Sequence, residues 1–250
     1  MPRLILIYAI LSYTLFLGVS IWLAAFLLDI NALRSSGTVM PWPQAAAVDI
    51  MLISLFGLVH SIMARPGFKR VWTRVIPPAA ERATYVLQSS VLLGLIFLYW
   101  QPINLTIWQV QGVASYAILV VFGAGVGIIA IATILLDHFE FTGLRQAWDN
   151  LGNAPARQSQ FRTPLLYRIV RHPLQLGIVM VMFAVPHMTV DGLLFALVML
   201  GYILIGLRFE ERALLREFGP AYRAYQRLVP MLLPRLSLRI PDLHRQRKDT

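Results

Sequence analysis

The sequence predicts an all-α integral membrane protein: a helical bundle of about six transmembrane helices, the last two forming a short hairpin, followed by a cytoplasmic C-terminal helix. Composition is the first support, because 58% of the 250 residues are hydrophobic, 14% are charged and the mean hydropathy is +0.66. These values are typical of membrane proteins. The second is that the basic residues gather between the apolar segments. The chain has no cysteine, which excludes disulfides and thiolate metal ligands.

Four apolar segments are long enough to cross a bilayer: Leu4–Leu28, Ala45–Met63, Ala83–Trp100 and Val113–Leu136. The first is longer than the apolar core of a secretory signal, so we expect it to be retained. Arg65–Arg74 carries apolar residues at helical spacing and predicts a short helix on the membrane surface, ended by Pro77 and Pro78.

The last two apolar segments, Leu174–Val185 and Leu193–Leu207, are shorter, and Pro186 and Gly192 bracket the turn between them. They predict a tilted helical hairpin, and the sequence alone leaves a re-entrant hairpin equally open. From Arg208 onward the chain is charged and amphipathic.

Six crossings place all but one of the 22 Lys and Arg residues on the same side, the exception being Arg34. The positive-inside rule then puts both termini in the cytoplasm, as expected of a multi-pass protein of the bacterial inner membrane. Topology explains the net charge of +10, so we expect membrane lipid around the chain and no nucleic-acid partner. No obligate protein partner is indicated. We expect one domain, 1–250, with N-terminal spans in 1–64 and the catalytic part in 65–250.

The stretch Tyr167–Gly177 predicts a helix that begins at Pro173, because proline suits the first turn of a helix. Arg171 and His172 then lie at a helix N-terminus near the membrane surface, where an anionic group is favoured. The alternative is a basic flank that contacts lipid phosphates. The five histidines have no close metal-ligand spacing, so we expect no metal.

Other ionisable residues lie at predicted membrane edges. Asp137, His138 and Glu140 close the fourth segment and form either a site wall or ordinary interfacial residues. His60 lies one turn inside the second segment, where a hydrogen-bonded interface histidine is the simpler interpretation. The glycine-rich Gly123–Gly127 lies within a span and predicts close helix packing rather than a nucleotide loop.

Glu210 and Glu211 follow directly on the last apolar segment, and Tyr222 and Tyr225 share a helical face beyond them. An interfacial helix with a tyrosine belt would look the same. A hairpin of two short spans would instead bring this helix and the Arg171 region around one cavity.

The motif RHPLQLG, followed by FEERALLREFGPAYRAYQRLVPMLLP, resembles the C-terminal half of the isoprenylcysteine carboxyl methyltransferase superfamily. Gln175 stands where that superfamily usually has tyrosine. Together with HSIMARPGFKRVWTRVIPPAAERATYVL and LLDHFEFTGLRQAW, the chain is similar to the bacterial methanethiol S-methyltransferases from His60 to Pro234. The resemblance implies S-adenosylmethionine-dependent methylation of methanethiol, a small volatile thiol, to dimethyl sulfide, with hydrogen sulfide as a related substrate and S-adenosylhomocysteine as the other product. A methyltransferase for a larger lipophilic or isoprenoid acceptor, and a non-enzymatic denitrification-linked member, are the alternatives.

Thiol methylation needs an aligned thiolate, and an alkanethiol is less acidic than cysteine, whose pKa is roughly 8.5, so a base or positive potential is useful. Together with the resemblance, this implies three groups of site residues. The catalytic candidates are His172, His138, Asp137 and Arg171. The cofactor-binding candidates are Tyr167, Arg171, His172, Pro173, Leu176, Glu210, Glu211, Tyr222 and Tyr225. The substrate-binding candidates are His60, Arg145, Gln146 and Gln175, and no metal ligand is expected.

Overall fold

Residues 1–30, 40–152 and 161–235 are described by the computed structural model of the chain. Within them, five helices are long and apolar enough to cross a membrane: α1 (Pro2–Leu27), α2 (Trp42–Met63), α4 (Pro78–Tyr99), α5 (Val113–Leu135) and α9 (Val190–Leu228). The predicted helical class is confirmed, and the chain is an integral membrane protein by the length and composition of these helices. Arg34, the exception in the charge distribution, lies outside the described residues.

The shorter helices lie in the segments that connect the long ones. The predicted surface helix is α3 (Pro66–Trp72), in which the rings of Phe68 and Trp72 stack at 5.7 Å. Two short helices, α6 (His138–Thr142) and α7 (Leu144–Leu151), follow α5, and the 3-10 turn η2 (Leu165–Arg168) precedes α8 (Pro173–Phe183). With 11 residues, α8 is shorter than the roughly 20 residues that a straight membrane crossing needs.

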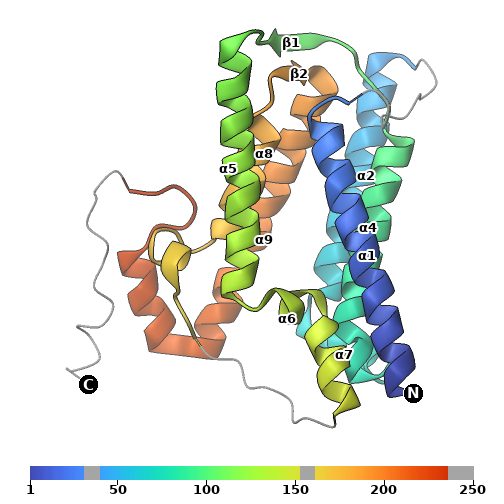
Figure 1. Cartoon of the computed structure of the whole chain (residues 1–250), viewed down its shortest axis with the longest axis vertical. Coiled ribbons are helices and arrows are strands. Elements are labelled where there is room, and N and C mark those ends of the chain that lie inside the picture. The colour runs from blue at the N-terminus through green and yellow to red at the C-terminus, as the bar shows by residue number, and fades with distance from the viewer. Residues whose placement is uncertain (31–39, 153–160, 236–250) are drawn as a thin grey trace.

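Helix α9 is longer than the short segment Leu193–Leu207 that the sequence predicted as the second half of a hairpin. It runs for 39 residues from Val190 to Leu228, so the last apolar segment and the charged stretch after it are one element. The sole interruption inside it is a kink at Gly219, whose φ of 51° favours glycine, with Pro220 starting the next turn. The kink turns residues 220–228 aside, as the orange-red end of the chain shows in Figure 1.

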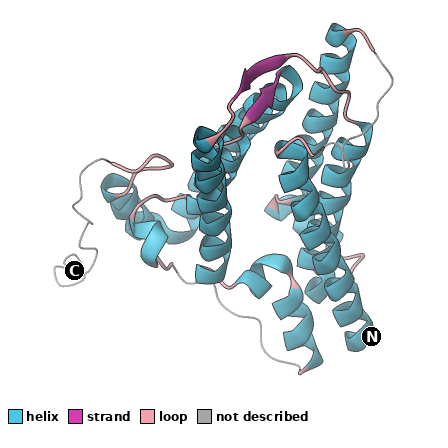
Figure 2. Cartoon of the chain, turned by 45° about the horizontal axis from the view of Figure 1, so that its top comes forward, coloured by secondary structure: helices cyan, strands magenta, loops and turns pink. Residues whose placement is uncertain are grey.

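The upright helices form two groups (Figures 1 and 2): α5, α8 and α9 stand together, and α1, α2 and α4 stand together. Within the groups α5 packs on α8 and α1 packs on α4, while α2 contacts α9 and joins the two groups. The shared core lies near one end, where Phe26 packs against the rings of Phe97, Trp100 and Phe195 at 4.9–5.3 Å.

Close packing of α5 on α8 depends on glycine, as predicted. A Cβ on Gly125 would lie 2.9 Å from Val181 Cγ1, and one on Gly177 would lie 2.7 Å from the Gly125 carbonyl oxygen. Gly123 and Gly127 face open space. The glycine-rich stretch is therefore a helix-packing surface with Gly125 at the contact.

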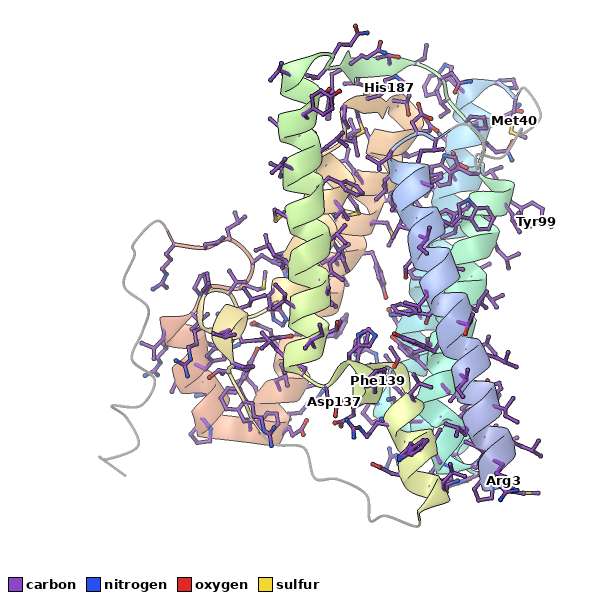
Figure 3. All side chains as sticks on the ribbon, in the orientation of Figure 1. Arg3, Met40, Tyr99, Asp137, Phe139 and His187 are labelled. Atoms are coloured by element: carbon purple, nitrogen blue, oxygen red, sulfur yellow. The ribbon has the colours of Figure 1, made fainter. Side chains whose placement is uncertain are left out.

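The sequence did not predict a short antiparallel ribbon at one end of the bundle, formed by β1 (Thr106–Gln109) and β2 (His187–Thr189). His187 and Met40 lie at this end, whereas Arg3, Asp137 and Phe139 lie at the opposite end (Figure 3). The ribbon pairs the α4–α5 connection with the α8–α9 connection. The charged segments lie at the opposite end of the bundle, near Arg3.

Candidate functional site

A cavity of about 360 Å³ lies where the last turns of α5, the start of α8 and the charged part of α9 meet. This volume lies within the range of about 300–1,000 Å³ typical of small-molecule sites. Its wall includes Leu136, the residue before Asp137, so the cavity belongs to the Arg3 end of the bundle (Figure 3). The lining residues are Arg82, Ala132, Thr133, Leu136, Phe141, Phe161, Arg162, Tyr167, Arg171, His172, Leu174, Gln175, Glu210, Leu214, Phe218, Tyr222 and Tyr225.

Seven of the predicted site residues line this one cavity, although they come from three stretches of the chain: Tyr167, Arg171, His172, Gln175, Glu210, Tyr222 and Tyr225. Backbone hydrogen bonds explain why these stretches lie together. The amides of Arg171 and His172 donate to the carbonyls of Pro230 and Met231 at 2.9 and 3.1 Å. The segment after α9 is thereby fixed beside the start of α8.

Arg171 joins α8 to α9. Its Nε donates to Glu211 Oε1 at 2.6 Å, and its Nη1 donates to the carbonyl oxygens of Gln226 and Val229. The side chains of Arg171 and Glu211 are only 10% and 14% exposed. Among the described residues, no hydrogen bond uses Arg171 Nη2, so the guanidinium that lines the cavity keeps one donor group for a ligand.

Glu211 accepts four hydrogen bonds: from Arg171, from His172 Nε2 at 3.1 Å, from the Tyr222 hydroxyl at 3.3 Å and from Gln226 Nε2 at 2.8 Å. Four donors match the acceptor capacity of a carboxylate. Burial alone would raise the pKa of Glu211, but the hydrogen bonds from Arg171 and His172 outweigh it and hold the pKa below its ordinary value. Glu211 does not line the cavity. Glu211 is therefore an ionised group outside the cavity, and its hydrogen bonds hold the lining residues Arg171, His172 and Tyr222 in place.

His172 lies between two carboxylates. Its side chain is 4% exposed, with Nε2 at Glu211 Oε1 and Nδ1 3.9 Å from Glu210 Oε2. Because an ionised Glu211 only accepts, Nε2 carries a proton. Pro173 begins α8 as predicted, and the extended φ of −126° at His172 follows from the proline after it. Leu176 lies on α8 outside the lining and contributes its amide to the His172 carbonyl.

Glu210 is the carboxylate that faces the cavity. Its side chain is 49% exposed, and it is part of the cavity wall beyond the apolar part of α9, which ends near Leu207. Burial among the surrounding groups raises its pKa, the His172 ring lowers it, and Glu211 raises it again, with a net increase. Glu210 thus differs from its neighbour: it faces the cavity, it accepts no hydrogen bond from any residue in the described ranges, and its ion-pair contact is with His172 Nδ1 at 3.9 Å.

Three tyrosines and a phenylalanine form the aromatic side of the cavity. The ring of Phe161 lies 5.9 Å from Tyr222 and 5.4 Å from Tyr225. Tyr225 donates to the Tyr167 carbonyl at 2.5 Å, and the Tyr167 hydroxyl donates to the Ala132 carbonyl at 3.4 Å. Burial raises the pKa of all three tyrosines, so their hydroxyls stay protonated at neutral pH. Each hydroxyl proton is used within the protein, since Tyr222 donates to Glu211, so the site presents aromatic faces and hydroxyl oxygens beside Glu210.

The second predicted group, on α5–α7, lies apart from this wall. His138 has both ring nitrogens engaged, with Tyr13 and with Thr133, each at 3.0 Å. Asp137 accepts from the Glu140 amide as the N-cap of α6 and pairs with Arg145 at 3.1 Å. Gln146 donates to the Glu140 carbonyl at 3.0 Å. None of the four predicted residues, Asp137, His138, Arg145 and Gln146, lines the cavity, and their contacts stabilise the turn between α5 and α7.

His60 lies between α2 and α4, where its ring nitrogens meet the Ser89 hydroxyl at 2.8 Å and the Tyr85 hydroxyl at 2.5 Å. It is also outside the lining. In the described part of the chain, no three His, Cys, Asp or Glu side chains are arranged to hold a metal ion.

Sequence reasoning missed Arg82, Phe141, Phe161 and Arg162 as members of the wall. Arg82 illustrates why: it counted only as one of many basic residues at a membrane edge. Its Nε donates to the Phe141 carbonyl at 2.7 Å, a contact between α4 and α6 that no local pattern reveals.

Comparisons with known proteins agree on one family. The family profile described as "NnrU protein" matches residues 50–228. Methanethiol S-methyltransferase of Pseudomonas deceptionensis is 50% identical over 202 residues, which cover 80% of this chain and 77% of the relative. Methanethiol S-methyltransferase 2 of Bradyrhizobium diazoefficiens is 44% identical, with 94% and 92% covered. The Mycobacterium tuberculosis methanethiol S-methyltransferase is 42% identical, with 92% and 96% covered. No solved structure matches the chain significantly.

Proposed function

The chain belongs to the NnrU protein family and to its methanethiol S-methyltransferases, and we propose that it methylates methanethiol to dimethyl sulfide, with S-adenosylmethionine as the donor and the cavity at the start of α8 as the site. The observation that carries the placement is the convergence of Arg171, His172, Glu210, Tyr222 and Tyr225 on one cavity. Hydrogen sulfide is a related acceptor of the same chemistry.

The residues present fit the donor group by group. S-adenosylmethionine carries a carboxylate, an ammonium and a sulfonium. Arg171 Nη2 suits the carboxylate, because none of the hydrogen bonds among described residues uses it. Glu210 suits the ammonium or the ribose hydroxyls, and the faces of Phe161, Tyr222 and Tyr225 suit the sulfonium. When bound, the donor supplies an activated methyl group.

The chain's own contribution is alignment and exclusion of water. Methyl transfer between sulfur atoms is an in-line displacement, whose rate depends on how well the two sulfur atoms are held. Glu211 fixes Arg171 and His172, so the polar wall is rigid before the donor binds. Leu214, Phe218 and Leu174 close the apolar wall and limit the access of water.

The acceptor is small, and the lining near α8 carries Gln175 where the wider superfamily has tyrosine. Methanethiol dissolves in the bilayer, whereas the donor is polar and enters from water. A site at the Arg3 end serves both, because it joins apolar helix ends to charged segments (Figure 3).

For the membrane arrangement we propose six crossings, with α8 and the apolar part of α9 as the last two. Both termini and the cavity then face the cytoplasm of the bacterial inner membrane, in keeping with the positive-inside rule. The basic residues of α3, η2 and the charged part of α9 agree with this orientation.

The direct test is product formation. Purified protein in detergent or nanodiscs, supplied with methanethiol and methyl-deuterated S-adenosylmethionine, should release dimethyl sulfide with one labelled methyl group into the headspace. Farnesylated cysteine offered instead should give little product. If the prenylated acceptor is methylated in preference to methanethiol, the protein acts on the larger substrate class. If folded protein forms neither product, the proposed methyltransferase activity is refuted.

A further inference from the structure

Helices α2 and α9 pack along a common seam, outside the cavity. A Cβ on Gly57 would lie 2.9 Å from the Tyr202 ring, and the Ser61 hydroxyl donates to the Tyr202 hydroxyl at 3.4 Å. Both helices begin at the ribbon end, since α2 follows Met40 and α9 follows β2, so they run parallel towards the Arg3 end (Figure 3). The seam therefore reaches the end of the membrane-spanning part of both helices.

Each of these two helices carries an exposed stripe beside the seam, made of two apolar residues followed by an arginine. The stripes are Leu58, Ile62 and Arg65 on α2, and Ile205, Phe209 and Arg212 on α9. Both have the spacing i, i+4 and i+7, which keeps their members on one face of a helix. The four apolar side chains are 41–60% exposed, so together they form an apolar surface that the described protein leaves uncovered.

The two stripes meet at Phe209. The guanidinium carbon of Arg65 lies 4.3 Å from the Phe209 ring centroid, and that of Arg212 lies 5.8 Å from the same centroid. An aromatic face attracts a cation, so this ring keeps both guanidinium groups beside it. Within the described ranges, no carboxylate pairs with Arg65 or Arg212, and no hydrogen bond uses their nitrogens. Two positive groups with unused donors therefore stand at one end of the apolar surface.

We propose that this surface binds an anionic phospholipid, with the phosphodiester held by Arg65 and Arg212 and the acyl chains along the apolar members of the stripes. A guanidinium group bonds a phosphate through two parallel N–H donors, which suits it to such a headgroup. The arginines follow the apolar parts of the two helices, which end at Met63 and near Leu207, and so lie at the depth of lipid headgroups. Charge and depth thus match the two parts of one lipid molecule.

The charge of the site favours an anionic over a zwitterionic lipid. An ammonium or choline group would bring a third cation to a surface that already holds two guanidinium groups. The acidic residues that precede Arg212 in the chain are directed elsewhere, because Glu210 lines the cavity and Glu211 binds Arg171 at 2.6 Å. Lipid binding at this surface does not depend on which reaction the cavity supports.

Titration of delipidated protein in detergent with phosphatidylglycerol, followed by native mass spectrometry and thermal unfolding, tests the site. From the contribution of one basic residue near an anionic lipid surface, Arg65→Gln and Arg212→Gln should each weaken binding about fivefold, and the double variant roughly thirtyfold. Phosphatidylcholine should bind the parent more weakly and should not distinguish the variants. Arg3→Gln and Arg223→Gln replace exposed arginines outside the stripes, and these controls should bind phosphatidylglycerol like the parent.

Three results would overturn the proposal. The first is equal binding of phosphatidylglycerol and phosphatidylcholine by the parent, and the second is parental affinity for phosphatidylglycerol in the double variant. The third is the same weakening in Arg3→Gln as in the stripe variants, which would show a general effect of net charge. Glycerol 3-phosphate carries the phosphate without acyl chains and should leave the melting temperature unchanged; a shift equal to that with the lipid would assign the arginines to a soluble phosphate instead. None of these measurements uses dimethyl sulfide formation, so the proposed function can fail without deciding them.

Discussion

Glu211→Ala is expected to lower the free energy of unfolding by about 3 kcal/mol, because removing one partner of a buried ion pair leaves an uncompensated charge. Arg171, His172, Tyr222 and Gln226 all lose the acceptor that they share. Arg171 keeps the carbonyls of Gln226 and Val229, which places the loss at the lower end of the range for such pairs. Donor binding should weaken as well, since the cavity wall is no longer ordered.

Thermal unfolding in detergent, combined with calorimetry, measures both effects, and exposed Glu217 on the same helix supplies the control variant Glu217→Ala. Acid should act in the same direction as the substitution. The pKa of Glu211 lies below its ordinary 4.5 in the folded protein, so its contribution to stability is complete above that value and is lost as the pH falls through the lowered pKa. Unchanged melting in Glu211→Ala would contradict the role of Glu211 as an organising centre.

Glu210→Gln should show the opposite pattern: weaker donor binding in a fully stable protein. A lost charge-assisted hydrogen bond costs roughly 1.5–3 kcal/mol, or about tenfold to more than a hundredfold in affinity. The Glu210 side chain is 49% exposed and accepts no hydrogen bond among the described residues, so the amide variant should melt close to the parental temperature.

The pH dependence of binding gives a second criterion for Glu210. Donor affinity in the parent should rise with pH above the ordinary value of 4.5, as the Glu210 carboxyl ionises, and Glu210→Gln should lack this rise. Calorimetric titration with S-adenosylmethionine over this range measures it, with Glu217→Gln as the control. Equal affinity and equal pH dependence in the two proteins would remove Glu210 from the donor site.

The cavity was predictable because its residues carry local signals. Pro173 marks a helix start beside Arg171 and His172, and Glu210 marks the point where an apolar helix becomes charged. What could not be predicted is the division of labour between Glu210 and Glu211. It depends on a contact between residues 40 apart in the chain, Arg171 and Glu211, and on the kink at Gly219 that brings Tyr222 back to Glu211.

The helices likewise divide into those that a local signal predicts and those that depend on the folded chain. Hydrophobic length predicted four of the long helices, α1, α2, α4 and α5, because membrane thickness sets that scale. The continuity of α9 past Arg208 was not apparent, since a change from apolar to charged residues looks like the end of an element although the backbone needs no break there. His138 and Asp137 have ordinary hydrogen-bond partners on α1, α5 and α7, which only the folded chain supplies.

The most direct test of the account is hydrogen–deuterium exchange of the purified protein with and without S-adenosylhomocysteine. The account predicts slower exchange in peptides that cover Tyr167–Gln175 and Glu210–Tyr225, and no change in the ribbon of β1 and β2 at the other end of the bundle. Protection confined to the ribbon, or to the glycine-rich part of α5, would show that the donor binds elsewhere and would contradict the placement of the site at the start of α8.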